Sequence, residues 1–527
     1  MKETSDEINC YKIKYNKINN INVLISGEFS YTPLGRHTLS FLHTLKNDSS
    51  INIFLDVIVH ESAENDYLTL MNNREFKPAN SKDFYFQYDF VFYTHIIPNN
   101  YDVCQYTRLN FSKRNGHIRG YYCVYDGTIP PLHWIDFINN KFDICLTPSR
   151  FIAQSLIYYG VKICCFGLHC LVINEDYLLY SKKINNRVFK FGFIGTVDFK
   201  KDVPLLINAF SNEFKSNEDI ELHLHLTGIP DSLMRREIKS AIANSKKSKS
   251  CITITEGHLP QNEIEDIFKS FDAYVFPQKI TGYFTTIAEA LSIGLPVVTS
   301  SIPPLLEILD YIDTKNNIFW VDSKNFAPSF HSFSHYMLLG ACFESLQTDL
   351  QKTLRNVFNN RNYLLNDKLV QKRKKAGKKL SESQLSSVWI KLIKPESIGV
   401  TISYFDLYNN ILFLNQTLFD KYKKIYPTIE INDCLVTRRA KENSFWYLNT
   451  KEHDLIEKIS KYHQSLILSM INDSKHNNFY ERSIERELLS IIKRFLFLIC
   501  KLLSSKKNIE TLSKKIFKRL KLFIALN

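Results

Sequence analysis

The amino-acid sequence predicts an α/β protein with two Rossmann-like domains built on parallel sheets. The first observation is its length, because 527 residues can bury two or three hydrophobic cores. The second is that buried strand patterns alternate with helix patterns in two separate stretches, which is typical of parallel sheets. The third is its composition: 44% hydrophobic and 23% charged residues are typical of a globular chain and exclude gross disorder.

The first Rossmann-like domain is expected over residues 20–180, after a polar leader at 1–19. Residues 21–27 form a buried strand pattern, and a loop that ends at Gly35 leads into a helix pattern that reaches Leu45. A strand, a glycine-containing loop and a helix are the start of a Rossmann-like unit, although the strict G-x-G-x-x-G pattern is absent. Further strand patterns follow at 51–60, 89–95, 118–125, 142–147 and 161–166.

The second Rossmann-like domain is expected over residues 187–325, and its most informative part is 276–300. After an apolar strand and a turn with proline and glycine, a helix pattern covers 285–293 and stops at Gly294. A turn that leads into a helix presents unpaired N–H groups and the positive end of the helix dipole, which favour a phosphate or another anion. Glu289 lies about one turn inside this helix. The alternative is an ordinary crossover with a solvated Glu289.

The same segment resembles a family signature. It is similar to the pattern P-S-x-x-E-G-F-G-L-x-x-x-E-A-x-x-x-G-x-P-V-V of retaining glycosyltransferases with the GT-B fold (family 4, glycosyl transferases group 1). Two positions depart from the pattern, because Thr281 replaces the first acid of the E-x7-E motif and Phe284 replaces the second glycine. The matching residues are Pro277, Gly282, Tyr283, Glu289, Ala290, Gly294, Pro296, Val297 and Val298.

A second motif lies at the start of the same domain. The strand at 189–195 and the residues after it resemble the family pattern F-x-G-R-x-x-x-x-K-G-x-x-x-L-I-x-A-F. Lys201 matches the lysine, and Thr196 stands where the family has arginine. In the family both cations hold the donor diphosphate, so the loss of one should cost about 3–4 kcal/mol of leaving-group stabilisation, by analogy with removal of one oxyanion donor. The alternative for Lys201 is a solvated loop lysine.

In the first domain the resemblance is weaker, and it implies the acceptor side of the enzyme. Gly35 and Arg36 are the candidates for the loop that lies opposite the donor phosphates; the alternative is that Arg36 only starts a surface helix. Tyr125 and Asp126 occupy the place where many relatives have a histidine or glutamate near the reacting sugar. Asp126 is therefore expected to make a polar contact there, and a loop-capping aspartate is the alternative.

The resemblance covers about residues 21–392, and it implies the GT-B fold, in which two Rossmann-like domains face a cleft. Closing helices are expected over 326–398. Residues 400–527 have no counterpart in the family and are expected to form a basic α-helical extension. Within it, 491–503 and 514–523 mix bulky apolar residues with lysine and arginine, so they could lie in an anionic membrane interface or pack on a domain or partner.

The resemblance also implies how the site would act on a nucleotide-diphosphate sugar. Glu289 would hold the ribose hydroxyls, and Thr281 would contact the donor sugar. Lys201 and the backbone of residues 283–286 would neutralise the diphosphate, and domain closure would exclude water. The expected donor-binding residues are Gly35, Arg36, Gly195, Thr196, Lys201, Gly282, Tyr283, Phe284, Thr285, Thr286 and Glu289. The expected catalytic residues are Glu289, Lys201, Thr281 and Asp126.

No metal and no cofactor is expected beyond the nucleotide-sugar substrate. The chain has no Asp-x-Asp, which agrees with a fold that holds diphosphate with lysine and helix amino-termini. The eleven cysteines are scattered and mostly in apolar strand patterns, which indicates buried thiols in a reducing compartment. The group Cys164, Cys165, His169 and Cys170 lacks a second ligand pair at zinc spacing.

The net charge of the chain and the length of its apolar runs indicate which partners it could bind and where in the cell it would be found. A formal charge of +13 suits an anionic partner such as nucleotide phosphates or a lipid surface. No signal peptide is visible, and no run reaches the ~18 apolar residues of a membrane span. We therefore expect a cytoplasmic protein that could touch the cytoplasmic face of a membrane, with a glycan, lipid or protein acceptor. No nucleic-acid partner is expected, because no RNA or DNA module is recognisable.

The function that the sequence predicts is a retaining, metal-independent glycosyltransferase of the hexosyltransferase type. Two other classes remain open. One is a catalytically degenerate GT-B protein that binds nucleotide or glycan, which Thr196 and Thr281 suggest. The other is a basic scaffold or nucleic-acid-binding protein that acts through its C-terminal extension. An epimerase or phosphorylase with the same fold is disfavoured only by analogy.

Overall fold

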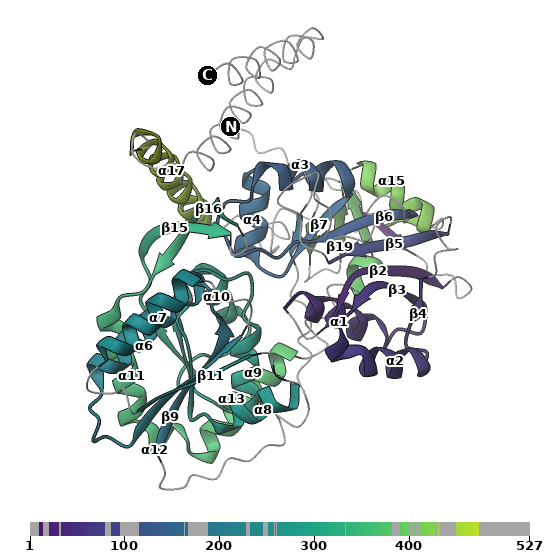
Figure 1. The fold of residues 1–527 in the computed structure, drawn as a ribbon. Helices are drawn as coiled ribbons and strands as arrows, with labels where there is room; N and C mark the ends of the chain where they lie inside the picture. Colours follow the sequence, from purple (N-terminus) through teal and green to yellow (C-terminus); the bar gives the residue numbers. More distant parts are fainter. Residues whose placement is uncertain are drawn as a thin grey trace.

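The computed structural model contains two Rossmann-like α/β domains that lie side by side (Figure 1). Each has its own parallel sheet, so the predicted α/β fold with two parallel-sheet domains is confirmed. The structure describes residues 10–13, 20–30, 33–79, 86–94, 115–162, 164–166, 188–227, 232–245, 251–257, 259, 261–331, 334–381, 390–395, 397–400, 404–406, 411–414, 416–426, 429–432 and 450–473.

The first domain has a seven-stranded parallel sheet in the order β4-β3-β2-β5-β6-β7-β8. The strand order reverses direction between β2 and β5, and ligands of open α/β sheets bind outside the carboxyl ends of strands at such a point. The strands are β2 (Ile21–Phe29), β3 (Ile51–Val59), β4 (Lys77–Pro78), β5 (Gln87–Tyr93), β6 (Asn115–Tyr122), β7 (Ile144–Thr147) and β8 (Cys164–Phe166). The helices are α1 (Pro33–Leu45), α2 (Glu64–Asn72), α3 (Leu132–Lys141) and α4 (Arg150–Tyr158).

The second domain has a six-stranded parallel sheet in the order β11-β10-β9-β12-β13-β14, which reverses between β9 and β12. All residues of β12 and β13 are buried, because helices cover both faces of a parallel sheet. The strands are β9 (Phe189–Thr196), β10 (Ile220–Thr227), β11 (Ile252–Glu256), β12 (Ala273–Phe276), β13 (Val297–Ser300) and β14 (Ile318–Val321). The helices are α6 (Val203–Glu213), α7 (Ser232–Asn244), α8 (Gln261–Ser270), α9 (Thr285–Ile293), α10 (Pro303–Leu306), α11 (Gln347–Asn359), α12 (Arg361–Leu364) and α13 (Asp367–Ser381).

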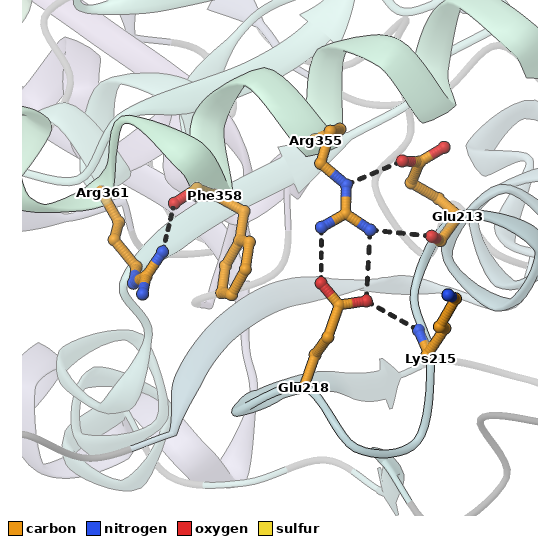
Figure 2. A network of polar contacts seen from close by, with 6 residues as sticks. All are labelled: Glu213, Lys215, Glu218, Arg355, Phe358 and Arg361. Atoms are coloured by element: carbon orange, nitrogen blue, oxygen red, sulfur yellow. Dashed lines mark hydrogen bonds and ion pairs between the residues drawn. The ribbon is translucent and has the colours of Figure 1, made fainter.

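Arg355 of α11 holds this helix against α6 of the second domain (Figure 2). Nε of Arg355 donates to Oε1 of Glu213 at 2.7 Å, and Nη2 donates to the carbonyl oxygen of Glu213 at 2.8 Å. The same guanidinium donates to both carboxylate oxygens of Glu218, at 2.5 and 3.2 Å. A guanidinium with five donors in a rigid fork suits such a shared contact. This contact holds α11 in place against the second domain.

Residues 326–398, expected as closing helices, begin instead with an antiparallel hairpin. The hairpin consists of β15 (Asn325–His331) and β16 (Ser334–Glu344), and the helices α11, α12 and α13 come after it. Gly340 in β16 has φ of +83°, a conformation that does not occur inside an α-helix. The prediction was therefore wrong for 326–344.

A strand before the first domain and four strands after α13 form a small third sheet in the order β18-β19-β17-β1-β20. The expected polar leader thus contains a strand, and the expected helical extension contains strands as well as helices. Four-residue strands carry too little periodicity to be recognised when their partners are far away in the sequence. The strands are β1 (Cys10–Ile13), β17 (Ser397–Val400), β18 (Tyr404–Asp406), β19 (Ile411–Leu414) and β20 (Ile429–Asn432), with helices α15 (Gln416–Ile425) and α17 (Thr450–Asp473).

The basic segments 491–503 and 514–523 lie outside the described residues. Within the described part of the chain, no helix combines the length and the apolar character that crossing a membrane requires. The described helix α17 packs on the hairpin, where the ring of Tyr462 lies 5.6 Å from that of Phe326. This part of the extension therefore packs on the protein itself.

Helix α13 packs closely along α9, the helix that follows β12. A Cβ on Gly377 would come within 2.4 Å of Oγ of Ser292, so only glycine allows this approach. Arg373 is fully buried and donates to three carbonyl oxygens: Gly294 at 2.6 Å, Asn316 at 3.1 Å, and Leu364. Gly294 and Leu364 end α9 and α12, so the guanidinium satisfies carbonyl groups at two helix ends. Burial lowers the pKa of Arg373 to about 9.

Replacing Arg373 with methionine should lower the free energy of unfolding by about 3 kcal/mol, because three buried carbonyl oxygens lose a charged donor. Urea denaturation followed by circular dichroism measures this change. Lys375→Met lies on the exposed face of the same helix and should change the free energy by no more than ~0.5 kcal/mol. Equal unfolding midpoints for R373M and the wild type would contradict this assignment.

Candidate functional site

The carboxyl ends of the two sheets meet at the domain interface, where α1 follows β2 and α9 follows β12. Nη1 of Arg36, in the first turn of α1, donates to Oε1 of Glu289 in α9. The Glu289 side chain is 5% exposed and that of Arg36 is 26% exposed. The structure thus brings together two predicted site residues that are 253 positions apart in the chain. Arg36 does not merely start a surface helix, and Glu289 is not solvated.

Asp126, in the loop after β6, forms a second contact across the interface. Its Oδ1 accepts a hydrogen bond from the backbone N–H of Gly282 at 2.8 Å, and its Oδ2 lies 3.2 Å from Nζ of Lys200. The Lys200 side chain is 5% exposed. Burial raises the pKa of Asp126, but the charges of Lys200 and Lys201 outweigh this effect and hold the pKa below its usual value. Asp126 is therefore a charged bridge between the domains.

Lys201 follows Lys200 in the same 3-10 turn and is half-buried. Its Nζ is 5.0 Å from the centre of the Phe276 ring and 2.8 Å from the side-chain oxygen of Gln278, with the Gln278 amide oriented to accept. Burial lowers the pKa of Lys201, and the charges of Asp126 and Asp198 oppose this shift. Sequence reasoning missed Lys200, which reaches the interface directly. The sequence did carry a signal for it, namely the two consecutive lysines. Consecutive residues of a 3-10 turn point in different directions, so only one of the two can face the other domain in this way.

The loop before α9 is tightly folded around Gly282. A Cβ at this position would come within 2.6 Å of Cγ1 of Val124, in the first domain, so a side chain would push the domains apart. Thr281 is 5% exposed, and its hydroxyl donates to the carbonyl oxygen of Tyr283 at 2.9 Å. The rings of Tyr283 and Phe284 stack with centres 4.3 Å apart. The Thr281 side chain therefore shapes the loop.

The remaining predicted residues lie at the same edges of the two sheets. Gly35 faces Ser30 so closely that a Cβ would come within 2.2 Å of its Oγ, which brings the start of α1 against the end of β2. Gly195 and Thr196 end β9, next to β12 and β10. Thr285 and Thr286 are half-buried in the first turn of α9. Contacts between the domains are therefore seen for Arg36, Glu289 and Gly282, and the donor-binding role of the whole set stays a prediction.

A third interdomain contact lies at the start of α4. Glu307, which follows α10, accepts hydrogen bonds from Oγ of Ser149 at 2.9 Å and from the backbone N–H groups of Arg150 and Phe151 at 2.9 and 2.7 Å. Nη1 of Arg150 also lies 2.9 Å from Oδ2 of Asp310. Burial raises the pKa of Glu307 to about 7, although the N–H groups of Phe151 and Arg150 oppose this shift. A carboxylate of one domain thus caps a helix of the other.

The hairpin strand β16 contacts loops on both sides of the interface. The backbone N–H of Thr128 donates to the carbonyl oxygen of Leu339 at 3.0 Å, and Oγ1 of Thr128 accepts from the N–H of Ala341 at 2.8 Å. Further along the strand, the N–H of Phe343 donates to the carbonyl oxygen of Lys279 at 2.8 Å. Thr128 lies two residues after Asp126, and Lys279 lies three residues before Gly282. One strand therefore positions both loops, and sequence reasoning missed it.

Other features of the described residues lie apart from this site. No three His, Cys, Asp or Glu side chains among them are grouped so that they could hold a metal ion. Among the described cysteines, Cys251 is half-buried, and the buried ones are Cys123, Cys145, Cys164 and Cys342. A shallow pocket of about 220 Å³ lies between α3, β7 and α15, and it is lined by Ile138, Asn139, Phe142, Asp143, Ile144, Cys145, Lys162, Thr417, Leu418 and Lys421.

The architecture is the GT-B fold, which two facing Rossmann-like domains define. Residues 188–332 match the model of the family described as glycosyl transferases group 1. No curated protein sequence matches the chain. The match covers the sheet of the second domain, where both sequence motifs lie.

Many solved structures are similar to this chain, and three of them illustrate the range. A glycosyltransferase from Rickettsia africae ESF-5 is 13% identical, with 72% of this chain and 98% of that chain covered and a TM-score of 0.50. HepE from Anabaena, in complex with UDP-glucose, is 11% identical, with coverage of 71% and 99% and a TM-score of 0.49. Sucrose-phosphate synthase from Thermosynechococcus elongatus is 10% identical, with coverage of 71% and 98% and a TM-score of 0.45. The likeness to the Rickettsia structure shows the fold alone.

His37, next to Arg36, is buried, and its ring lies 4.9 Å from that of Tyr122. Burial, and next the charge of Arg36, lower the pKa of His37 to about 3, although Asp126 opposes this shift. Below pH ~6.5 the unfolded chain takes up a proton at His37 that the folded chain does not. The stability that depends on a neutral His37 is therefore present above this pH and is lost as the pH falls.

We expect the free energy of unfolding to fall by up to about 1.4 kcal/mol per pH unit below pH 6.5, relative to that of His37→Gln. Urea denaturation at pH 7.5 and at pH 5.5 measures the difference. His60→Gln changes an exposed histidine of the same domain and should keep the wild-type dependence. An identical pH dependence in H37Q and the wild type would show that His37 is not buried in neutral form.

Proposed function

We propose that this protein is a glycosyltransferase that transfers a sugar from a nucleotide-diphosphate sugar to a glycan, lipid or protein acceptor. The observation that carries the proposal is the meeting of both family motifs with polar residues of the first domain. Glu289 of one motif lies against Arg36, and Gly282 of that motif and Lys200 of the other lie against Asp126, at the carboxyl ends of both sheets. The match of residues 188–332 to glycosyl transferases group 1 supports the same reaction class.

On the donor side, Glu289 would accept hydrogen bonds from the ribose hydroxyls. This carboxylate now pairs with Arg36, so nucleotide binding would exchange an ion pair for two hydroxyl donors. Lys201 and the backbone N–H groups of residues 283–286 would neutralise the diphosphate as the glycosidic bond breaks, because charge then develops on the leaving nucleotide. Fixed donors of this kind need no bound metal, so we propose a metal-independent reaction.

On the acceptor side, Asp126 is the carboxylate that would lie near the reacting sugar. The contacts of Asp126, Glu307 and Thr128 all join the two domains, so a donor between them would be shielded from water. Exclusion of water favours transfer to an acceptor over hydrolysis. By the family resemblance, we propose that the anomeric configuration is retained.

A degenerate GT-B protein that binds nucleotide without turnover is the second candidate. Thr196 supplies no positive charge, and the hydroxyl of Thr281 is committed to the carbonyl oxygen of Tyr283. A basic scaffold is a weaker candidate, because the segments that motivated it lie outside the described residues. A measurement of turnover distinguishes an active glycosyltransferase from a protein that only binds nucleotide.

A thermal-shift screen with nucleoside diphosphates and their sugars should find a stabilising ligand. A ligand at about a hundred times its dissociation constant adds ~2.7 kcal/mol to the free energy of unfolding. Glu289→Ala should reduce the shift at the same ligand concentration, because the ribose loses its acceptor. Glu75→Ala removes the carboxylate of a remote ion pair with Lys46 and should leave the shift unchanged. An unchanged shift in E289A would show that Glu289 does not contribute to ligand binding.

Purified protein with the stabilising nucleotide-sugar should release the nucleoside diphosphate, by transfer or by slow hydrolysis, equally well with and without EDTA. Lys201→Met should lower the rate by about 10²–10³-fold, the effect of removing one donor to a developing anion. Release of nucleotide is followed by chromatography of quenched samples. If EDTA stopped the reaction and magnesium restored it, the metal-independent mechanism would be wrong. Ligand binding without any release would favour the degenerate binding protein.

A further inference from the structure

The carboxylate of Asp126 is held as a bound anion would be held. One oxygen accepts the backbone N–H of Gly282 at 2.8 Å, and the other lies 3.2 Å from Nζ of Lys200. These donors belong to the second domain, whereas Asp126 belongs to the first. The loop of Gly282 and the cation of Lys200 therefore converge on one small volume, which a negative group of the other domain fills.

Donors that hold two carboxylate oxygens also suit two oxygens of a phosphate. Both anions accept charge-assisted hydrogen bonds from ammonium groups and backbone N–H groups at similar distances. The Lys200 side chain is 5% exposed, so its charge acts where water screens it weakly. The first turn of the nine-residue helix α9 begins three residues after Gly282. The same place therefore favours a diphosphate.

Lys200 could also supply the positive charge that is missing from the second motif. Thr196 stands where the resembling family has an arginine, so this chain lacks one cation for the diphosphate. Nζ of Lys201 lies 5.0 Å from the centre of the Phe276 ring and 2.8 Å from the side-chain oxygen of Gln278, whereas Nζ of Lys200 lies 3.2 Å from the Asp126 carboxylate of the first domain. A second cation is thus available within the same turn of chain.

We propose that Lys200 and the N–H of Gly282 form a phosphate subsite of the donor site, and that the Asp126 carboxylate occupies this subsite until the donor displaces it. The proposal rests on the proposed function. Asp126 is then an internal counter-ion that neutralises Lys200 in the unliganded protein. Donor binding moves the phosphate onto Lys200 and frees the Asp126 carboxylate for the sugar side of the site.

Inorganic pyrophosphate tests the subsite without any assumption about the base or the sugar. Isothermal titration calorimetry at fixed ionic strength gives its dissociation constant, and UDP and GDP serve as second probes. Asp126→Asn removes the competing charge, and its amide oxygen can still accept from Gly282. We expect D126N to bind pyrophosphate at least tenfold more tightly than the wild type. Lys200→Met should weaken binding at least tenfold, and Lys200→Arg should restore most of it.

Asp143→Asn is the matched control. The Asp143 carboxylate also accepts one backbone N–H, that of Arg119 at 2.9 Å, and also pairs with one lysine, Lys421. It lies in the first domain beside α15 and outside the site. D143N should leave pyrophosphate binding unchanged. A thermal melt without ligand checks that each variant folds, and D126N with Lys200→Arg decides the question if K200M does not.

Weaker pyrophosphate binding in D126N would overturn the proposal, because Asp126 would then support the ligand. Dissociation constants within twofold of the wild type in D126N and K200M would overturn it as well. These two variants could bind pyrophosphate normally while E289A no longer shows a thermal shift with a nucleotide-sugar. That result would support the proposed function and contradict the phosphate subsite. If neither the wild type nor D126N binds pyrophosphate, UDP or GDP, both proposals fail.

Discussion

The two domains are joined at the candidate site by two ion pairs, each with one buried and one partly exposed member. Neither Glu289 nor Asp126 has its cation on its own domain: Arg36 pairs with the first and Lys200 with the second, each across the interface. Burying an unpaired charge is costly, and a buried pair recovers that cost only with good geometry and additional hydrogen bonds. Separation of the domains would return all four groups to water. These ion pairs lie beside an apolar cluster that contains buried residues of both domains, so charge and apolar packing together fix how the domains dock.

Helix α9 connects this interface to the rest of the second domain. Its first turn faces the site, and its last carbonyl groups are held by Arg373 from α13. Glycine at 294 ends the helix, and glycine at 377 allows α13 to approach it. A helix that is fixed at its carboxyl end holds its first turn in place for a ligand. The switch points of both sheets lie at the same interface, where open α/β sheets bind ligands.

The parts of the fold with strong local patterns could be predicted from the sequence. The helix expected at 285–293 begins at Thr285 and ends at Ile293, because an apolar helix pattern and Gly294 define both ends locally. The pairing of Arg36 with Glu289 depends on how two domains dock, and no local pattern contains that information. The direction of the Lys200 side chain depends on a single 3-10 turn, which the sequence does not reveal. The alignment with the family motif therefore indicated Lys201 instead. The hairpin was mistaken for helix, since apolar residues around Gly340 show no clear period of two.

The place of β1 has a consequence for how the chain is made. This strand ends at Ile13, and its two neighbours in the third sheet, β17 and β20, begin only at Ser397 and Ile429. A ribosome that adds ~5–20 residues per second needs on the order of 20–80 s to reach them. β1 must therefore wait for these partner strands until both Rossmann-like domains have been translated.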